Sequence, residues 1–303
     1  MDSIPRHPGA TTAPGGRWRD SLAVWPQYIL PHHAISRLIH AITRSRRGWL
    51  KDRLIRWFIR RYGVDMTEAR EPTPEAYASF NAFFTRALKP ESRPIVSGRG
   101  EFACPVDGRV SQCGPIEGDR IFQAKGHYYS LQALLGGDAE DAQAFFGGSF
   151  ATLYLSPRDY HRIHMPANAR LRAMTHVPGR LFSVNPATTQ RVPGLFARNE
   201  RVVTWFDTEV GPMALVLVGA INVASIETVW AGEVTPPAGT RLRRWDYGGE
   251  AQPLLLERGQ EMGRFNMGST VVVLFSAGAV SWAPELRSGA VVRMGQLLAR
   301  STA

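Results

Sequence analysis

Beyond residue 150 the chain is a series of short apolar and β-branched runs, each bounded by Gly, Pro or Asp. Such runs are typical of strands, and Asp, Gly and Pro within residues 207–212 indicate a hairpin connection. Strands do not alternate with long helices, and no Gly-rich phosphate loop opens a helix, which argues against a doubly wound nucleotide fold. We therefore predict an α+β fold: an antiparallel β-rich core of sandwich or barrel type with helices ahead of it. The predicted strands are residues 150–155, 201–206, 213–218, 225–229, 271–275 and 291–293.

Two amphipathic helices are predicted before this core, one on each side of Gly48. Their apolar residues recur at helical spacing. They are Ile35, Leu38, Ile39 and Ile42, then Leu50, Leu54, Trp57 and Phe58. Residues 37–61 hold nine Lys and Arg against one acid, Asp52, and so supply +8 of the net charge of +10. Apolar stripes beside basic faces indicate helices that lie on an anionic membrane surface.

Two other interpretations of this basic segment stay open. The helices form a hairpin packed on their own domain with a solvated basic face, or they bind nucleic acid. We expect no nucleic acid, because no binding fold or stacking surface accompanies the charge. No apolar run approaches the roughly 20 residues that span a bilayer, so a peripheral protein is expected.

The remaining chain divides as follows. Residues 1–24 are rich in Pro and Gly without an apolar core, which predicts a mobile tail and no signal peptide. We expect residues 25–70 to form the membrane-associating helices and residues 71–303 to form the catalytic domain. Thr73 and Pro74 predict a helix start, with Tyr77, Phe80, Phe83 and Phe84 as its buried stripe, and residues 138–146 predict a short helix. Cys104 and Cys113 are expected to be reduced thiols of a cytoplasmic chain.

The tetrapeptide Met267-Gly268-Ser269-Thr270 carries a possible chemistry. A serine hydroxyl stands beside a glycine carbonyl that no side chain guards, just before the apolar run 271–275. Attack by the Ser269 oxygen on the Gly268 carbonyl, elimination of the resulting ester and hydrolysis of the dehydroalanine would leave a pyruvoyl group. Taken alone, Gly-Ser-Thr is more often an ordinary turn entering a strand.

The longer string around it, with seven other blocks in the same order, resembles the phosphatidylserine decarboxylases, from about residue 25 to the C-terminus. Met267 stands where leucine is common in this family, and no reactive group is missing. The blocks are residues 80–86 (FNAFFTR), 105–109 (PVDGR), 123–130 (QAKGHYYS), 160–166 (YHRIHMP), 178–185 (PGRLFSVN), 195–200 (LFARNE), 218–227 (VGAINVASIE) and 261–270 (EMGRFNMGST).

The resemblance implies the following roles. The chain cuts itself between Gly268 and Ser269 into chains 1–268 and 269–303, and Ser269 becomes the pyruvoyl cofactor. His164 is the base for the Ser269 hydroxyl and Asp107 orients His164, in a Ser-His-Asp arrangement. His161 serves the later decarboxylation of phosphatidylserine to phosphatidylethanolamine. A homodimer at the cytoplasmic face of the cell membrane is also implied.

Without the resemblance, Asp107 is read as a turn residue and both histidines as neutral buried or surface groups. No metal is expected, since the two histidines have neither a His-Glu-x-x-His pattern nor a cysteine partner. Three other functions stay open: a serine hydrolase that uses Ser269 in an intact chain, an uncleaved lipid-binding protein, and a pyruvoyl decarboxylase of a soluble amino acid. The basic amphipathic helices disfavour the last.

Overall fold

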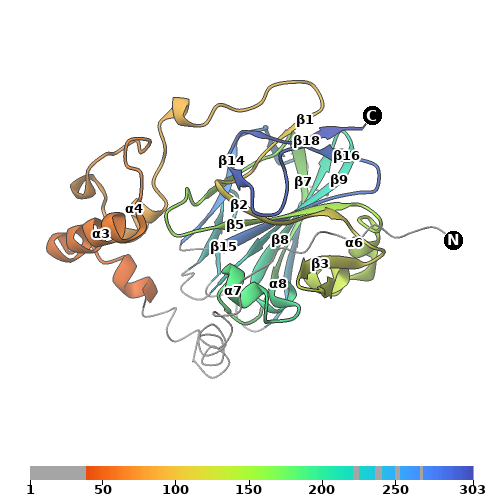
Figure 1. The fold of residues 1–303 in the computed structure, drawn as a ribbon, viewed down its shortest axis with the longest axis horizontal. Helices are drawn as coiled ribbons and strands as arrows, with labels where there is room; N and C mark the ends of the chain where they lie inside the picture. Colours follow the sequence, from red (N-terminus) through yellow and green to blue (C-terminus); the bar gives the residue numbers. More distant parts are fainter. Residues whose placement is uncertain (1–38, 221–224, 236–240, 250–252, 267–268, 303) are drawn as a thin grey trace. The chain divides into compact units, whose positions relative to one another are not determined.

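The computed structural model describes residues 39–220, 225–235, 241–249, 253–266 and 269–302, all within one compact unit, residues 31–303 (Figure 1). The predicted tail, residues 1–24, lies outside the described residues. So do the start of the first predicted helix and Gly268.

A nine-stranded sheet forms the core, and all its pairings are antiparallel. Its order is β12-β7-β8-β9-β15-β5-β2-β17, with β13 also paired to β7. The strands are β2 Gly108–Pro115, β5 Ser149–Leu155, β7 Ala169–Val177, β8 Arg201–Thr208, β9 Gly211–Val218, β12 Arg243–Asp246, β13 Leu255–Leu256, β15 Ser269–Phe275 and β17 Val291–Val292. Every residue of β15 is buried, because β5 and β9 flank it within the sheet.

Three smaller antiparallel sheets complete the β structure, in the orders β1-β18-β16, β11-β10-β14-β6 and β3-β4. Their strands are β1 Glu101–Ala103, β3 Arg120–Ala124, β4 His127–Ser130, β6 Arg162–His164, β10 Ile226–Thr228, β11 Gly232–Thr235, β14 Glu261–Phe265, β16 Val280–Trp282 and β18 Leu297–Ser301. The four-stranded sheet matters for the site, since β6 begins directly after His161 and ends at His164, and β14 ends three residues before Gly268.

The predicted antiparallel α+β fold is confirmed. Each predicted strand is present with shifted ends, and the predicted hairpin joins β8 to β9. The nine-stranded sheet is open rather than a closed barrel: in the described part of the chain, its end strands β12 and β17 do not pair with each other.

The helices are short except for one. They are α3 Gly48–Tyr62, α4 Phe80–Phe84, α5 Leu131–Leu135, α6 Ala139–Gln143, α7 Pro186–Thr189 and α8 Leu195–Arg198, with 3₁₀ turns η3 Pro74–Ala76 and η4 Pro90–Ser92; residues 39–43 are also helical. Helix α3 confirms the second predicted amphipathic helix and ends at Gly63, whose φ of 65° favours glycine. Helix α6 confirms the helix predicted in residues 138–146, and Asp138 caps it.

The single helix predicted from Thr73 is wrong. Pro74 opens only a 3₁₀ turn, Tyr77 is extended, and α4 starts afresh with Ser79 as its cap. The Ser79 hydroxyl accepts a hydrogen bond from the Ala82 amide, which fixes the later start. The predicted buried stripe is confirmed nevertheless, because Tyr77, Phe80, Phe83 and Phe84 all point into one core.

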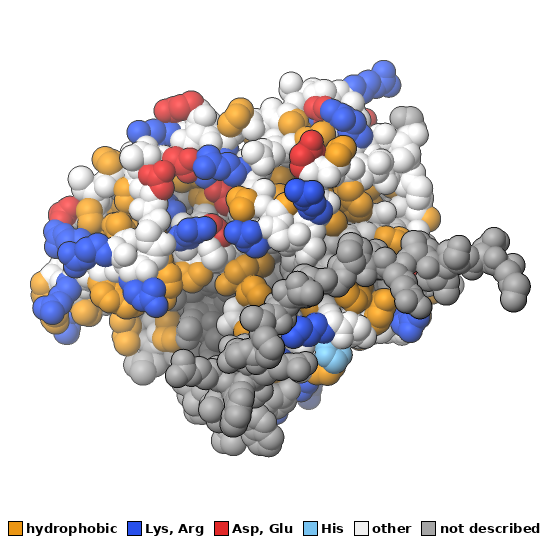
Figure 2. Space-filling model, viewed as in Figure 1, with side chains coloured by type: hydrophobic (Ala, Val, Ile, Leu, Met, Phe, Trp, Pro, Cys, Tyr) orange, Lys and Arg blue, Asp and Glu red, His pale blue; other side chains and the backbone are white. Residues whose placement is uncertain are grey.

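Helix α3 packs one face on α4 and leaves the other in solvent. Phe58 is buried among the rings of Phe80, Phe83 and Phe84. Trp49 is 71% exposed and Trp57 49% exposed. Figure 2 shows hydrophobic and basic side chains side by side over the part of the surface that carries α3 and α4. Within the described residues, no helix is long and apolar enough to cross a bilayer.

Candidate active site

Ser269 is the first residue of β15, and strand pairing fixes its position. It lies opposite Leu155 of β5, while its neighbour Thr270 lies opposite Val218 of β9. Ser269 is fully buried, and its Oγ has no hydrogen-bond partner among the described residues. A buried hydroxyl without a partner is uncommon and costs stability. This orphaned hydroxyl suits a nucleophile whose partner is the reacting carbonyl itself.

Asn266 holds the chain on the other side of the junction. Its Nδ2 donates to Glu227 Oε1 at 2.6 Å and also to the Ser225 hydroxyl. Its Oδ1 accepts from Asn81 Nδ2 at 2.9 Å, and its backbone amide donates to the Ser225 carbonyl. The chain is therefore held just before and just after residues 267–268.

His161 is hydrogen-bonded both to the chain next to the strand partner of Ser269 and to the chain just before Asn266. Its Nε2 is 3.0 Å from the Ser156 carbonyl, one residue after the Leu155 that pairs with Ser269. Its own carbonyl accepts from the Phe265 amide. A carbonyl only accepts, so Nε2 carries the proton and Nδ1 the lone pair. Nδ1 is buried without a partner in the described chain.

Burial sets the charge of His161. The ring is fully buried and stacks on Phe84 at 4.1 Å between centroids. Burial, helped by the positive charge of Arg86, lowers the pKa of His161 from 6.5 to about 3. The ring is therefore neutral at pH 7, and its Nδ1 carries a lone pair with no partner among the described residues.

His164, at the end of β6, has both nitrogens engaged. Nδ1 donates to the Gly259 carbonyl at 2.7 Å, and Nε2 accepts from the Tyr160 hydroxyl at 3.0 Å. Burial lowers its pKa, and the bond to Gly259 partly opposes that. His164 is thus also a neutral base. The hydrogen bond from the Tyr160 hydroxyl must break before the Nε2 lone pair of His164 can accept a proton from another group.

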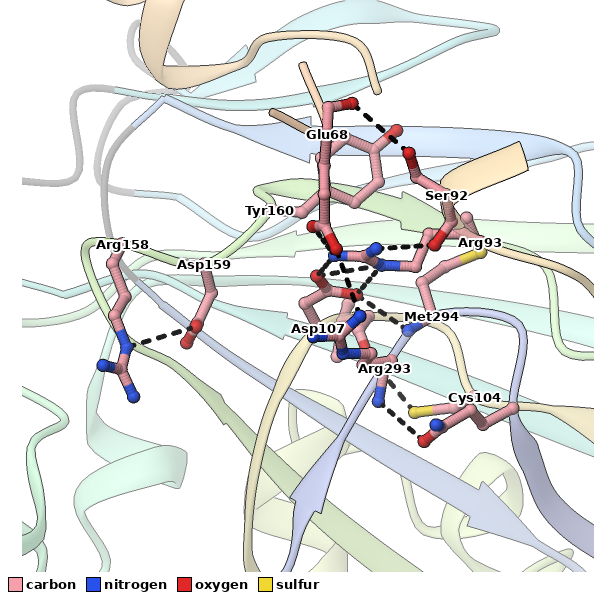
Figure 3. A network of polar contacts seen from close by, with 12 residues as sticks. Glu68, Ser92, Arg93, Cys104, Asp107, Arg158, Asp159, Tyr160, Arg293 and Met294 are labelled. Carbon is pink, nitrogen blue, oxygen red and sulfur yellow. Dashed lines mark hydrogen bonds and ion pairs between the residues drawn. The ribbon is translucent and has the colours of Figure 1, made fainter. Parts of the chain in front are cut away.

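Asp107 lies just before β2 and faces Arg93. Arg93 Nε donates to both carboxylate oxygens at 2.9 and 3.1 Å, and the Met294 amide donates to Oδ1 at 2.8 Å. Arg93 also binds Glu68 through Nη2 at 2.7 Å. Figure 3 shows Arg93 between the two carboxylates. Hydrogen bonds from Arg93 lower the pKa of Glu68, so the Glu68 carboxylate is ionised at neutral pH.

The structure thus brings together only part of the predicted Ser-His-Asp arrangement. Asp107 influences the pKa of His164 through its charge, while its hydrogen bonds go to Arg93 and Met294. His161 is hydrogen-bonded to Ser156, next to the strand partner of Ser269, and to Phe265, four residues before Ser269; neither histidine bonds to Ser269 within the described residues. Sequence reasoning missed Arg93 and Asn266: Asn266 lies within the matched block 261–270 but was given no role, and Arg93 lies between two blocks.

A pocket of about 310 Å³ lies beside this region. Tyr62 of α3, Arg109 and Tyr154 line it, together with residues 156–159 of the loop that follows β5. The loop thus contacts His161 on one side and lines open space elsewhere. In the described part of the chain, no three His, Cys, Asp or Glu side chains gather as a metal site would need.

Comparison with known proteins identifies the family. A family model described as phosphatidylserine decarboxylase matches residues 80–300, and a second model, described as PSD, matches residues 22–63. These matches confirm that the protein is an enzyme, and one that removes a carboxyl group. The chain belongs to the phosphatidylserine decarboxylase family.

Curated relatives agree along nearly the whole chain. The phosphatidylserine decarboxylase proenzyme of Shewanella frigidimarina is 58% identical over 285 residues, 93% of this chain and 98% of the relative. That of Pseudomonas aeruginosa PAO1 is 59% identical over 283 residues, again 93% and 98%. Both relatives are named proenzymes, a name that fits a chain that is processed after synthesis.

We predict that the buried neutral histidines make this protein acid-sensitive. The folded state holds fewer protons at His161 than the unfolded state, so stability is fully present above pH 6.5 and falls as pH drops toward about 3. The loss is about 1.4 kcal/mol per pH unit for each proton. Glu68 adds to the loss below about 4.5, its ordinary value.

Chemical denaturation of the Ser269→Ala chain at several pH values measures this slope on one homogeneous species. Adding His161→Gln should make the slope between pH 6.5 and 4.5 shallower, though not flat, since the pKa of His164 is also lowered. Equal slopes with and without His161 would contradict the assigned protonation state.

Proposed function

We propose that this chain is a proenzyme that cuts itself between Gly268 and Ser269 and then decarboxylates phosphatidylserine to phosphatidylethanolamine. The observation that carries the proposal is the buried Ser269 hydroxyl, which has no hydrogen-bond partner among the described residues, at the start of the central strand β15. Family membership supports the reaction and the substrate.

Self-cleavage follows from the position of Ser269. Its Oγ attacks the Gly268 carbonyl, which turns the peptide bond into an ester and frees the Ser269 amine. Elimination then breaks the ester bond, leaving a carboxylate on Gly268 and dehydroalanine at position 269. Water hydrolyses the dehydroalanine with release of ammonia, and a pyruvoyl group remains on chain 269–303.

His164 and Asp107 are proposed to assist this cleavage. His164 is neutral and so can take the proton of the Ser269 hydroxyl once Tyr160 releases Nε2. Burial lowers the pKa of His164, and the negative charge of Asp107 opposes that lowering. Asp107 thereby stabilises the resulting imidazolium. An orienting or charge-supporting carboxylate is worth less than the nucleophile or the base.

The pyruvoyl group supplies a carbonyl that binds the substrate amine and accepts the electron pair left when carbon dioxide departs. His161 is proposed to move the proton. Its Nδ1, which has no partner among the described residues, is proposed to deliver the proton to Cα after decarboxylation. Burial against Phe84 keeps water from competing for that proton.

The membrane is the proposed source of the substrate. The face of α3 away from α4 offers exposed Trp49 and Trp57 beside exposed Arg46, Arg47 and Arg53. Tryptophan suits the boundary between headgroups and acyl chains, and arginine suits anionic headgroups. We propose peripheral binding at the cytoplasmic face; assembly of the cleaved molecule as a homodimer rests on the family resemblance alone.

Four single variants separate making the cofactor from using it. Ser269→Ala should leave the chain wholly uncut, His164→Ala should accumulate uncut chain, and Asp107→Asn should slow the cut. His161→Ala should mature normally yet lose activity about a hundredfold or more, the usual worth of a positioned proton-transfer group. Denaturing gels and phosphatidylethanolamine formation are measured side by side. Cleavage blocked in His161→Ala but normal in His164→Ala would show that the two histidine roles are exchanged.

Vesicle binding tests the membrane surface. The triple variant Arg46→Glu, Arg47→Glu, Arg53→Glu should lose binding to vesicles that contain anionic lipid, while its self-cleavage stays normal. Wild-type binding should weaken as salt rises, because exposed charges are screened beyond about 8 Å at physiological ionic strength.

The matched control reverses three exposed arginines elsewhere, Arg99, Arg241 and Arg287, and so carries the same net charge. It should keep most of the binding. Equal losses in both triple variants would mean that only total charge matters, and undiminished binding of the α3 variant would refute the assignment.

A further inference from the structure

Arg86 is a buried arginine whose charge nothing in the described chain neutralises by contact. It follows α4, and only 4% of its surface is exposed. Its Nη2 donates to the Arg158 carbonyl at 3.1 Å, and its guanidinium lies 5.6 Å from the Phe83 ring centre. Nε and Nη1 are buried without any partner among the described residues. Three N–H donors are therefore left without an acceptor.

The carboxylates near Arg86 are all engaged elsewhere. Asp107, Asp159 and Glu68 act on its pKa through their charges, yet none forms a hydrogen bond with it. Asp107 and Glu68 are held by Arg93. Asp159 accepts from the amide and hydroxyl of Ser156, both at 2.7 Å. Burial accordingly lowers the pKa of Arg86, a sign that its charge is not compensated.

The same loop joins Arg86 to the candidate active site. Residues 156–158 give one carbonyl to His161 and another to Arg86, and they directly follow Leu155, the partner of Ser269. The positive charge of Arg86 also acts on His161. Three buried polar groups without full partners, on Arg86, His161 and Ser269, thus gather around one loop. Burying an unpaired charge is costly and is expected where a ligand will supply the counter-charge.

Resting on the function proposed above, we infer that Arg86 is the anion-binding subsite for the phosphodiester of the lipid substrate. The substrate has two anionic groups, and the chemistry favours the phosphodiester. A cation held against the carboxylate would stabilise the charge that must leave it, so it would bind the ground state better than the transition state. The phosphodiester keeps its charge throughout the reaction, and binding it holds the reacting end of the lipid beside His161.

Loop 156–158 covers this subsite in the uncut chain. The buried donors of Arg86 become reachable when the loop shifts. The hydrogen bond from Arg86 Nη2 to the Arg158 carbonyl is then replaced by one to the ligand. The pocket of about 310 Å³ lies on the same loop, and two arginines, Arg109 and Arg158, line it. The phosphodiester is placed at the loop for these reasons.

The test is Arg86→Gln, assayed with a soluble short-chain phosphatidylserine so that membrane binding does not enter. Because the interaction is the same in ground and transition states, KM should rise about tenfold or more, the worth of a charge-assisted hydrogen bond, with kcat little changed. Inhibition by short-chain phosphatidylethanolamine, which keeps the phosphodiester and lacks the carboxylate, should weaken by the same factor. Self-cleavage should be normal.

A matched control for stability is Arg201→Met, which removes a buried arginine of β8 whose Nε and Nη1 donate to the carbonyls of Leu134 and Asn199. It should lower the melting temperature, whereas Arg86→Gln should leave that temperature unchanged or raise it. Unchanged KM, unchanged inhibition by phosphatidylethanolamine, or a loss of stability like that of Arg201→Met would each overturn the inference. An inactive wild-type enzyme would instead overturn the proposed function.

Discussion

The pairing of β15 between β5 and β9 is the constraint on which the site depends. Seven successive residues of β15 pair with β5, and six of them also pair with β9, so its first residue has little freedom. That residue is Ser269. On the other side of the junction, the Asn266 side chain is held by Asn81, Ser225 and Glu227. The residues on both sides of the proposed cleavage site are thus held by strand pairing and by hydrogen bonds, and such positioning is what a weak nucleophile needs.

Burial gives this region its chemistry. The same apolar surroundings that stabilise the fold keep His161 and His164 neutral, and therefore able to accept protons. The aromatic cluster of α4 contributes directly, since Phe84 stacks on His161 while Phe83 lies against Arg86. Because Phe58 of α3 packs on the same rings, the proposed membrane-binding helix and the proposed proton-transfer residue share one core. The helix proposed to hold the lipid headgroup and the residue proposed to transfer the proton thus contact the same aromatic rings.

Much of the fold was readable from the sequence, because strand signals are local. The run 271–275 predicted β15, which starts two residues earlier at Ser269, and the turn residues within 207–212 predicted the β8–β9 hairpin. The helix expected from Thr73 failed because a capping serine six residues later competes with the proline start. Ser269 and both histidines were predicted from the matched blocks that contain them, and their roles stay predictions.

The polar network of the site was not readable, because its partners are distant in the chain. Asp107 was expected beside His164, but Arg93 and the Met294 amide, 187 residues away, hold its carboxylate. Arg86 was part of a matched block, yet nothing in a sequence says that an arginine will be buried without a counter-charge. Such residues become visible only when every buried donor is matched with its acceptor.

The central claim is that Ser269 becomes the cofactor, and the intact mass of the denatured, purified enzyme tests it most directly. The account predicts two chains, 1–268 and 269–303, with the shorter one lighter by one ammonia than a chain that begins with serine and shifted by borohydride reduction. A fully active preparation that contains only the uncut chain of 303 residues would contradict it.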